Sequence, residues 1–252
     1  MTPMPDFSLK GRNALITGAG RGIGRAIAEV YAQAGASVWL VARTGAEVEN
    51  VAETLRGEGL DAQAAAVDVT DAAAFRNFVS SLPRLDIFVN NAGTNRPRPF
   101  VEVTEDDFDL VAGLNFRAAF FALQTVAQHM IDNGGKASII NMSSQMGHIG
   151  ARDRSLYCAT KWAIEGLTKA TAIELAPHGI RVNTICPTFI ETPLTRAYFE
   201  DETFRAHCLN MIKLGRIGVP TDITGAALYL ASDASSLMTG SHILLDGGWT
   251  AE

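Results

Sequence analysis

The chain has 252 residues, of which 47 % are hydrophobic and 19 % are charged. This length and composition allow one sizeable core, so we expect residues 1–252 to form a single domain. The formal net charge is −6 and the isoelectric point is about 5.4, so the chain lacks the basic surface that a nucleic-acid or anionic-lipid partner requires.

The first predicted unit is a strand, a glycine-rich turn, a helix and a second strand. Residues 13–17 form a short apolar run that leads into the turn 18–24, Gly-Ala-Gly-Arg-Gly-Ile-Gly. An amphipathic pattern follows and stops at Gly35, and residues 37–41 have the pattern of a buried strand. Glycine lets the backbone approach a pyrophosphate, and the helix start offers unpaired N–H groups. Between strand and helix, the turn predicts a dinucleotide site.

Strands and helices continue to alternate along the chain. We expect further strands at 62–67, 85–89, 137–142, 181–185 and 242–245, and helices at 46–55, 70–79 with Thr70 as N-cap, 105–131, around 157–175 and at 221–232. Thr104 and Asp107 form a candidate capping box for the helix 105–131, and 188–219 is expected to be looser. Seven buried strands alternating with helices predict an α/β fold with a doubly wound parallel sheet and helices on both faces.

Ligands of such sheets bind outside the carboxyl ends of the strands. The turns at Gly18, Asn90, Ser144 and Pro187 all lie at this edge. Tyr157 lies 13 residues after Ser144 in the sequence, within a helical pattern.

Tyr157 and Lys161 are four residues apart, so on a helix their Cβ atoms lie about 5–6 Å apart on one face. A phenol has a pKa of about 10, and a nearby ammonium favours the phenolate and lowers that pKa toward the working range. Ser144 leaves a strand end and can hydrogen-bond a substrate oxygen. A Tyr–Lys pair at this spacing is common in helices, so it indicates acid/base chemistry only together with a matching binding site.

The three cysteines, Cys158, Cys186 and Cys208, are too widely spaced for a disulfide framework or a zinc motif. We therefore predict no metal site. Residues 1–12 contain no apolar segment of a secretory signal, and no apolar run approaches the ~18 residues of a membrane span. Reduced thiols and these absences together predict a cytoplasmic protein without a membrane partner.

Several motifs occur in order at the predicted strand ends: 17–24, Asp68-Val69, the Asn-Asn-Ala-Gly run 90–93, Asn115, Ser144, Tyr157-x-x-x-Lys161 and 187–192. With these motifs the chain resembles the short-chain dehydrogenase/reductase family over nearly its whole length. The resemblance implies a Rossmann-like seven-stranded fold and NAD(P)-dependent hydride transfer to or from a carbon that bears oxygen. It also implies a homotetramer, joined through the helices of Asn115 and Tyr157 and the last strand.

The resemblance further implies which residues hold the coenzyme. They would contact the pyrophosphate and adenosine side (Gly18, Arg21, Ile23, Gly24), the adenine (Asp68, Val69), the adenosine ribose (Asn91, Ala92, Gly93) and the nicotinamide amide (Ile190, Thr192). Alternatively, Asp68 only caps a turn and does not contact the adenine. The family usually has Pro-Gly where this chain has Pro187-Thr188, so the backbone near the nicotinamide is expected to differ slightly.

For catalysis, the resemblance implies that Tyr157 is the general acid in ketone reduction and the base in alcohol oxidation. Lys161 would hold the nicotinamide ribose and lower the pKa of Tyr157, and Ser144, with Gln145 beside it, would contact the substrate. Asn115 would hold a water that links Lys161 to solvent. Asn115 as the partner of a buried backbone group is the alternative, and Asn90 is expected to bridge two strands.

The end of the second strand bears on coenzyme choice. An NAD site needs an acidic residue about 20 residues after the glycines, to accept from the ribose 2′-OH. Here Ala42 occupies that position, and no carboxylate follows until Glu47. Arg43 can bind a 2′-phosphate by charge-assisted bonds, so we predict NADP(H) over NAD(H). Arg43 lying over the adenine or in solvent is the alternative.

The stretches after Gly93, Ser144 and Pro187 are expected to wall the substrate pocket. They offer mostly polar groups: Thr94, Asn95, Arg96, Gln145, His148, Arg152, Arg154, Phe189 and Glu191. This set predicts a small polar substrate, namely a sugar, sugar acid, polyol or small ketone. A 3-oxoacyl-[acyl-carrier-protein] reductase is the main alternative, although the segments 132–136 and 174–178 are not strongly basic. A cofactor-sensing protein on the same fold is a further alternative, but such proteins tend to lose the Tyr–Lys pair.

Overall fold

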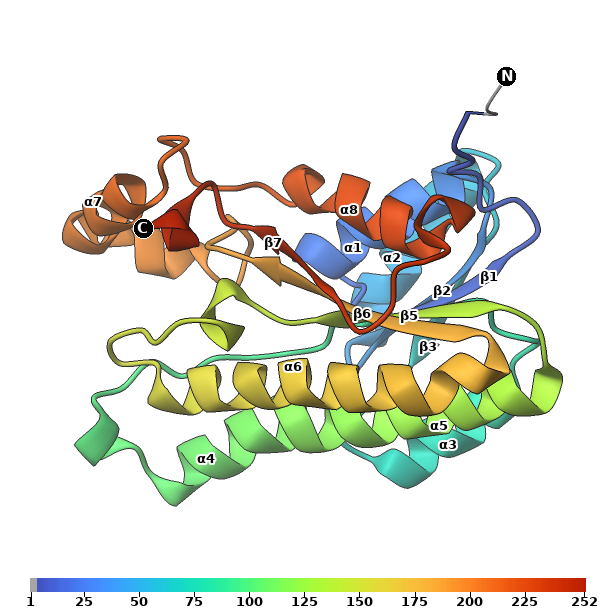
Figure 1. Ribbon diagram of the computed structural model, residues 1–252, viewed down its shortest axis with the longest axis horizontal. Helices are drawn as coiled ribbons and strands as arrows, with labels where there is room; N and C mark the ends of the chain where they lie inside the picture. The colour runs from blue at the N-terminus through green and yellow to red at the C-terminus, as the bar shows by residue number, and fades with distance from the viewer. Residues whose placement is uncertain (1–3) are drawn as a thin grey trace.

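The computed structural model describes residues 4–252, and one seven-stranded parallel sheet runs through it (Figure 1). The strands are β1 (Asn13–Thr17), β2 (Ser37–Ala42), β3 (Ala62–Ala66), β4 (Ile87–Asn90), β5 (Ala137–Met142), β6 (Ile180–Pro187) and β7 (His242–Leu245). Their order in the sheet is β3-β2-β1-β4-β5-β6-β7, so the winding direction reverses between β1 and β4. The predicted fold class is confirmed. Residues 1–3 of the predicted unit 1–252 lie outside the described part.

Helices cover both faces of the sheet (Figure 1). They are α1 (Gly22–Gln33), α2 (Gly45–Gly57), α3 (Ala72–Ser80), α4 (Glu105–Ala112), α5 (Ala119–Asn133), α6 (Ser155–Leu175), α7 (Glu202–Met211) and α8 (Thr221–Ala231). Side chains of α1, α2 and α8 share one core with the sheet, and those of α3, α5 and α6 share the other.

The central strands are mostly apolar and are buried along their whole length because both of their faces are covered. Every residue of β4 and β5 is buried. Within β5, Ile139 belongs to the core under α5 and α6, whereas Ile140 belongs to the core under α1 and α8. Successive side chains of a strand point to opposite faces, so a doubly covered strand has a continuous hydrophobic run. These packed layers hold the strand ends in fixed positions.

The predicted helix 105–131 is interrupted. Thr104 and Asp107 form the expected capping box, with the Asp107 N–H donating to Thr104 Oγ1 at 3.1 Å. Residues Gly113–Ala118 between α4 and α5 form a π-helical turn that contains Asn115. Such turns are frequent at functional sites. By length and composition alone the combined helix Glu105–Asn133 is apolar enough to cross a membrane, but its buried side chains pack on the sheet as those of a core helix do.

Two local predictions are wrong. The N-cap of α3 is Asp71 rather than Thr70, because Asp71 Oδ1 accepts from the N–H groups of Ala73 and Ala74 at 3.1 and 3.0 Å. The segment 188–219, expected to be loose, contains α7. This helix closes a small third apolar cluster, with Cys208 and Trp249 buried within it. Trp249, far along the chain, packs against α7, with its ring 5.8 Å, centre to centre, from that of His207.

Candidate functional site

The turns at the carboxyl ends of the strands enclose one cleft with a volume of about 360 Å³. Nearly all of the predicted site residues border this cleft: Gly18, Arg21, Ile23, Gly24, Arg43, Asp68, Val69, Asn91, Ala92, Gly93, Ser144, Gln145, Tyr157, Lys161, Ile190 and Thr192. Asn115 lies behind its wall. The structure thus brings together residues that are up to 174 positions apart, from Gly18 to Thr192.

The glycine turn after β1 has the geometry of a phosphate cradle. Gly18 and Gly22 have φ values of 66° and 58°, in the left-handed region that favours glycine. A Cβ on Gly24 would lie 2.4 Å from the Gly18 carbonyl oxygen, so no larger residue fits there. At the start of α1, the N-cap residue Arg21 makes no side-chain capping bond, so the first N–H groups are free for an anion. These residues fit the pyrophosphate of a dinucleotide.

The neighbouring turns are tied to the cradle by side-chain hydrogen bonds. Asn91 Nδ2 donates to the Thr17 carbonyl at 2.9 Å and the Gly18 carbonyl at 3.3 Å. Asn90 bridges β4 and β5 as predicted, since its Nδ2 donates to Asn141 Oδ1 at 3.1 Å. Asp68 borders the cleft and also caps its own turn, accepting from the N–H and hydroxyl of Thr70 at 2.9 and 2.7 Å.

Tyr157 and Lys161 lie on one face of α6, next to the end of β5. Lys161 Nζ donates to the Met142 carbonyl at 2.8 Å and lies 5.4 Å from the centre of the Tyr157 ring. Burial raises the pKa of Tyr157 to about 12, against the effect of a hydrogen bond with Ser144, and burial lowers the pKa of Lys161 to about 8. The pKa of Tyr157 is therefore raised in this structure, and the lowering of that pKa by Lys161 stays a prediction. The ammonium is bonded to a backbone carbonyl, and desolvation of the phenol dominates.

Ser144 projects from the end of β5 beside Tyr157. Its Oγ accepts from the Met146 N–H at 3.1 Å and lies 3.4 Å from the Pro187 carbonyl oxygen. These two contacts fix the hydroxyl between the ends of β5 and β6. The hydroxyl is held where it can meet a substrate oxygen at the cleft.

Asn115 is buried in the π-helical turn and pairs with the backbone of Thr94. Its Oδ1 accepts from the Thr94 N–H and its Nδ2 donates to the Thr94 carbonyl, both at 2.8 Å. This is the alternative role that the sequence left open, because the pair satisfies a buried backbone group. Asn115 thereby fixes the segment that follows Gly93 at the cleft.

Only some of the residues expected at the substrate pocket reach it: Thr94, Asn95, Gln145 and Phe189. Arg96 pairs instead with Asp107 at 3.1 Å, and the Arg152 side chain is 96 % exposed. Arg154 is buried, with its guanidinium 5.4 Å from the centre of the Tyr198 ring. The other two, His148 and Glu191, also lie outside the cleft. The expectation of several arginines at the pocket is therefore wrong.

The catalytic end of the cleft contains buried polar atoms with no hydrogen-bond partner among the described residues. They are both amide atoms of Gln145 and the hydroxyls of Ser143 and Thr188. Thr188 stands where the family pattern has glycine, so this departure adds a hydroxyl to the cleft. Burying an unpaired polar group costs free energy, and a ligand that pairs with it removes that cost. The sequence offered no signal for Thr188 beyond this departure.

Comparison with known proteins agrees with this geometry. The family model described as enoyl-(acyl carrier protein) reductase matches residues 18–250. D-erythrulose reductase of Gallus gallus is 40% identical over 246 residues, which cover 97% of this chain and 98% of the relative.

Two solved structures are also similar along the whole chain. A short-chain type dehydrogenase/reductase from Mycobacterium marinum has 40% identity and a TM-score of 0.93, with 98% of each chain covered. A gluconate 5-dehydrogenase from Burkholderia cenocepacia, in complex with NADP and tartrate, has 36% identity and a TM-score of 0.93, again with 98% of each chain covered. On this similarity, and on a cleft that joins a glycine cradle to Ser144, Tyr157 and Lys161, the chain belongs to the short-chain dehydrogenase/reductase family of oxidoreductases.

Proposed function

We propose that the protein is an NADP(H)-dependent dehydrogenase that interconverts a small neutral ketose and the corresponding polyol. The observation that carries the proposal is the placement of unpaired buried polar groups on Gln145 and Thr188 in the cleft that also holds Ser144 and Tyr157. A substrate with several hydroxyl groups offers donors and acceptors to such groups. The similar proteins named for erythrulose and gluconate support this substrate class.

The coenzyme would lie along the cleft from the glycine turn to Tyr157. When bound, nicotinamide supplies or accepts the hydride. We assign its binding to residues at successive strand ends: Gly18, Arg21, Ile23 and Gly24 for the pyrophosphate side, Asp68 and Val69 for adenine, Asn91, Ala92 and Gly93 for ribose, Lys161 for the second ribose, and Ile190 and Thr192 for the amide.

The proton steps belong to the side chains on β5 and α6. In reduction, Tyr157 donates its phenolic proton to the substrate oxygen, which Ser144 holds by a hydrogen bond. In oxidation, the phenolate of Tyr157 removes the proton of the substrate hydroxyl. Lys161 would pass protons onward, and Asn115, bonded to the Thr94 backbone, would fix the segment beside that path. The charge that develops on the substrate oxygen is thus met by fixed donors.

The rates of the two directions should depend differently on pH. With its pKa raised to about 12, Tyr157 stays protonated from pH 6 to 9, so kcat/KM for reduction should be flat up to about pH 7 and should fall only where Lys161, with a pKa of about 8, loses its proton. Oxidation needs the phenolate, whose fraction rises about tenfold per pH unit below the pKa, so kcat/KM for oxidation should rise throughout. Steady-state assays of both directions in a constant-ionic-strength buffer series check this. An oxidation rate that levels off near pH 7 would contradict a strongly raised pKa in the working enzyme.

The preference for NADP(H) rests on the end of β2. Arg21 and Arg43 border this part of the cleft, and Ala42 has no acidic group to accept from a ribose hydroxyl. Glu47 also lies there, with its Cβ 2.8 Å from the position of a Cβ on Gly20. Two cations against this one carboxylate favour a 2′-phosphate.

Replacing Arg43 by alanine should therefore weaken the preference for NADPH over NADH. Loss of one charge-assisted bond of about 1.5 kcal/mol lowers kcat/KM for NADPH about tenfold and leaves that for NADH nearly unchanged. Arg76→Ala, an exposed change on α3 outside the cleft, is the matched control. A wild-type enzyme that prefers NADH, or a variant that loses activity equally with both coenzymes, would refute the assignment of Arg43.

A coupled absorbance screen tests the substrate class. The cations that border the cleft are Arg21 and Arg43 at the end of β2, and Lys161 beside the proposed proton donor Tyr157. Because no other arginine or lysine in the described chain borders it, we expect neutral ketoses and polyols to turn over faster than aldonates. β-Ketoacyl thioesters serve as the test of the acyl-carrier-protein alternative. Turnover of thioesters alone would overturn the proposed substrate.

Assembly as a homotetramer is proposed from the outer face of α4 and α6, which lie side by side (Figure 1). Exposed apolar side chains gather on these helices and the turn between α4 and α5: Phe108, Phe116, Trp162 and Ile173. The side chain of Trp162, for example, is 53 % exposed. Large exposed apolar patches mark interaction sites. We expect multi-angle light scattering at micromolar concentration to give four times the 26.9 kDa chain mass, and Trp162→Glu to lower it. A wild-type monomer would contradict this proposal.

The three free, buried cysteines support a reducing, cytoplasmic location.

A further inference from the structure

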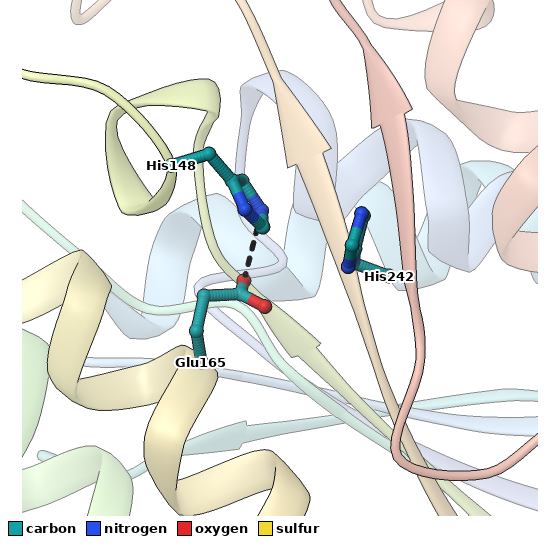
Figure 2. Close-up of side chains that lie close together, drawn as sticks. All are labelled: His148, Glu165 and His242. Carbon is teal, nitrogen blue, oxygen red and sulfur yellow. Dashed lines mark ion pairs between the residues drawn. The ribbon is translucent and has the colours of Figure 1, made fainter.

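Three metal-ligating side chains from distant parts of the chain meet beside α6 (Figure 2). His148 comes from the turn after β5, Glu165 from α6, and His242 from the first position of β7. Their ligand atoms all lie within 4.8 Å of one another. None of the three borders the coenzyme cleft, so the proposed hydride transfer leaves this cluster unexplained.

The spacing of the ligand atoms suits a small cation. His148 Nε2 lies 3.7 Å from Glu165 Oε1, and Figure 2 shows the two side chains pointing toward each other. Zinc binds nitrogen and oxygen at about 2.0–2.2 Å, so two ligands at the tetrahedral angle are about 3.3–3.6 Å apart. His242 is exposed, so rotation of its side chain can bring a ring nitrogen to that distance. The cluster needs only a small closure to hold an ion.

The carboxylate of Glu165 is held in position by donors from β6. Thr184 Oγ1 donates to its Oε2 at 3.2 Å, and Cys186 Sγ donates to its Oε1 at 3.3 Å. Outer hydrogen bonds of this kind orient the ligands of metal sites. They are not required for a simple surface ion pair.

Glu165 also has no lysine or arginine partner within 4.0 Å among residues 4–252. The residue is 7% exposed, and within 4.0 Å its one cationic partner among residues 4–252 is the imidazole of His148, which is mostly neutral at pH 7. A buried carboxylate needs a charged or coordinating partner. The ring of His242 lies 4.5 Å, centre to centre, from that of His148, and two imidazoles with one carboxylate form one of the known ligand sets of zinc.

We propose that His148, Glu165 and His242 bind a divalent transition metal of the zinc class, with water at the fourth position. Imidazole nitrogen favours such metals over calcium and magnesium, which prefer oxygen ligands alone. The ion would join the turn after β5, α6 and β7. Those elements surround Ser144 and Lys161, so the metal would brace the proton-transfer residues from behind.

Zinc titration of the untagged full chain tests the proposal. The protein is treated with chelator, freed of it, and titrated calorimetrically with Zn²⁺ in the absence of coenzyme and substrate. We expect one equivalent to bind, and Tm to rise with added Zn²⁺. Co²⁺ should give the visible absorption of a four-coordinate nitrogen–oxygen site. These readings do not depend on catalytic activity, so they stand apart from the proposed dehydrogenase function.

His242→Ala is the decisive variant because His242 is exposed and its loss should not disturb folding. Its Zn²⁺ affinity should fall by at least the ~10–100-fold that removal of an outer hydrogen-bond partner costs. Glu165→Gln should have the same effect. His178→Ala, an exposed histidine just after α6, is the matched control and should bind like the wild type. Equal Zn²⁺ affinity in the wild type and His242→Ala, or no binding by the wild type, would overturn the site.

Discussion

Replacing Tyr157 by phenylalanine is expected to lower kcat by about 10²–10⁴, the usual contribution of a positioned general acid. The change removes one oxygen and keeps the ring, which lies 5.4 Å from Lys161 Nζ. Coenzyme binding should stay nearly unchanged because the glycine cradle and the end of β2 are untouched. Steady-state turnover on the best substrate and coenzyme titration by intrinsic fluorescence are the two measurements.

Tyr229→Phe is the matched control for this experiment. It removes a phenolic oxygen from α8, away from the cleft, and should leave turnover unchanged. If Tyr157→Phe retained near-wild-type turnover, Tyr157 would not be the proton donor. The circular dichroism spectrum of the variant shows whether its fold is intact, so a loss of activity by unfolding is distinguishable.

Replacing Gln145 by leucine is expected to lower activity and raise stability at the same time. Both amide atoms of Gln145 are buried without a partner in the described chain, and an apolar group of similar size removes that cost, about 1–3 kcal/mol. Tm should therefore rise by about 2–4 °C per kcal/mol for a chain of this size. Loss of two hydrogen bonds to the substrate, about 1.5–3 kcal/mol, lowers kcat/KM about 10–150-fold.

Gln63→Leu is a fitting control. Gln63 Oε1 is also buried without a partner, but it lies on β3 and does not border the cleft. Its replacement should leave kcat/KM unchanged. A Gln145→Leu variant with unchanged kcat/KM would remove Gln145 from the substrate site, and one with a lowered Tm would show that the amide is satisfied in solution.

The proposed metal site and the proposed proton-transfer site share α6. Lys161 and Glu165 are one helical turn apart, and they face the end of β5 and the middle of β6 respectively. A single helix would thus hold a proton-transfer residue at the cleft and a metal ligand behind it. The zinc titrations decide this without reference to turnover.

The sequence by itself determined the succession of strands and helices along the chain. It also determined the local features of the site. The alternation of apolar runs with helical patterns gave the seven strands, the capping box at Thr104 marked the start of α4, and the glycine turn after β1 was visible as a motif. The four-residue spacing placed Tyr157 and Lys161 on one helix face. These features depend on residues within one or two turns of each other, so a linear pattern contains them.

Only the tertiary structure decided how the surroundings act on those residues. The pKa of Tyr157 is raised rather than lowered, because desolvation is summed over every element packed around the ring. Arg96 pairs with Asp107 and does not border the pocket, and side chains of α7 pack in one cluster with Trp249. His148, Glu165 and His242 show no motif spacing, yet three elements bring them within 4.8 Å. Burial and long-range contact depend on how the layers pack, and no local window of sequence contains that information.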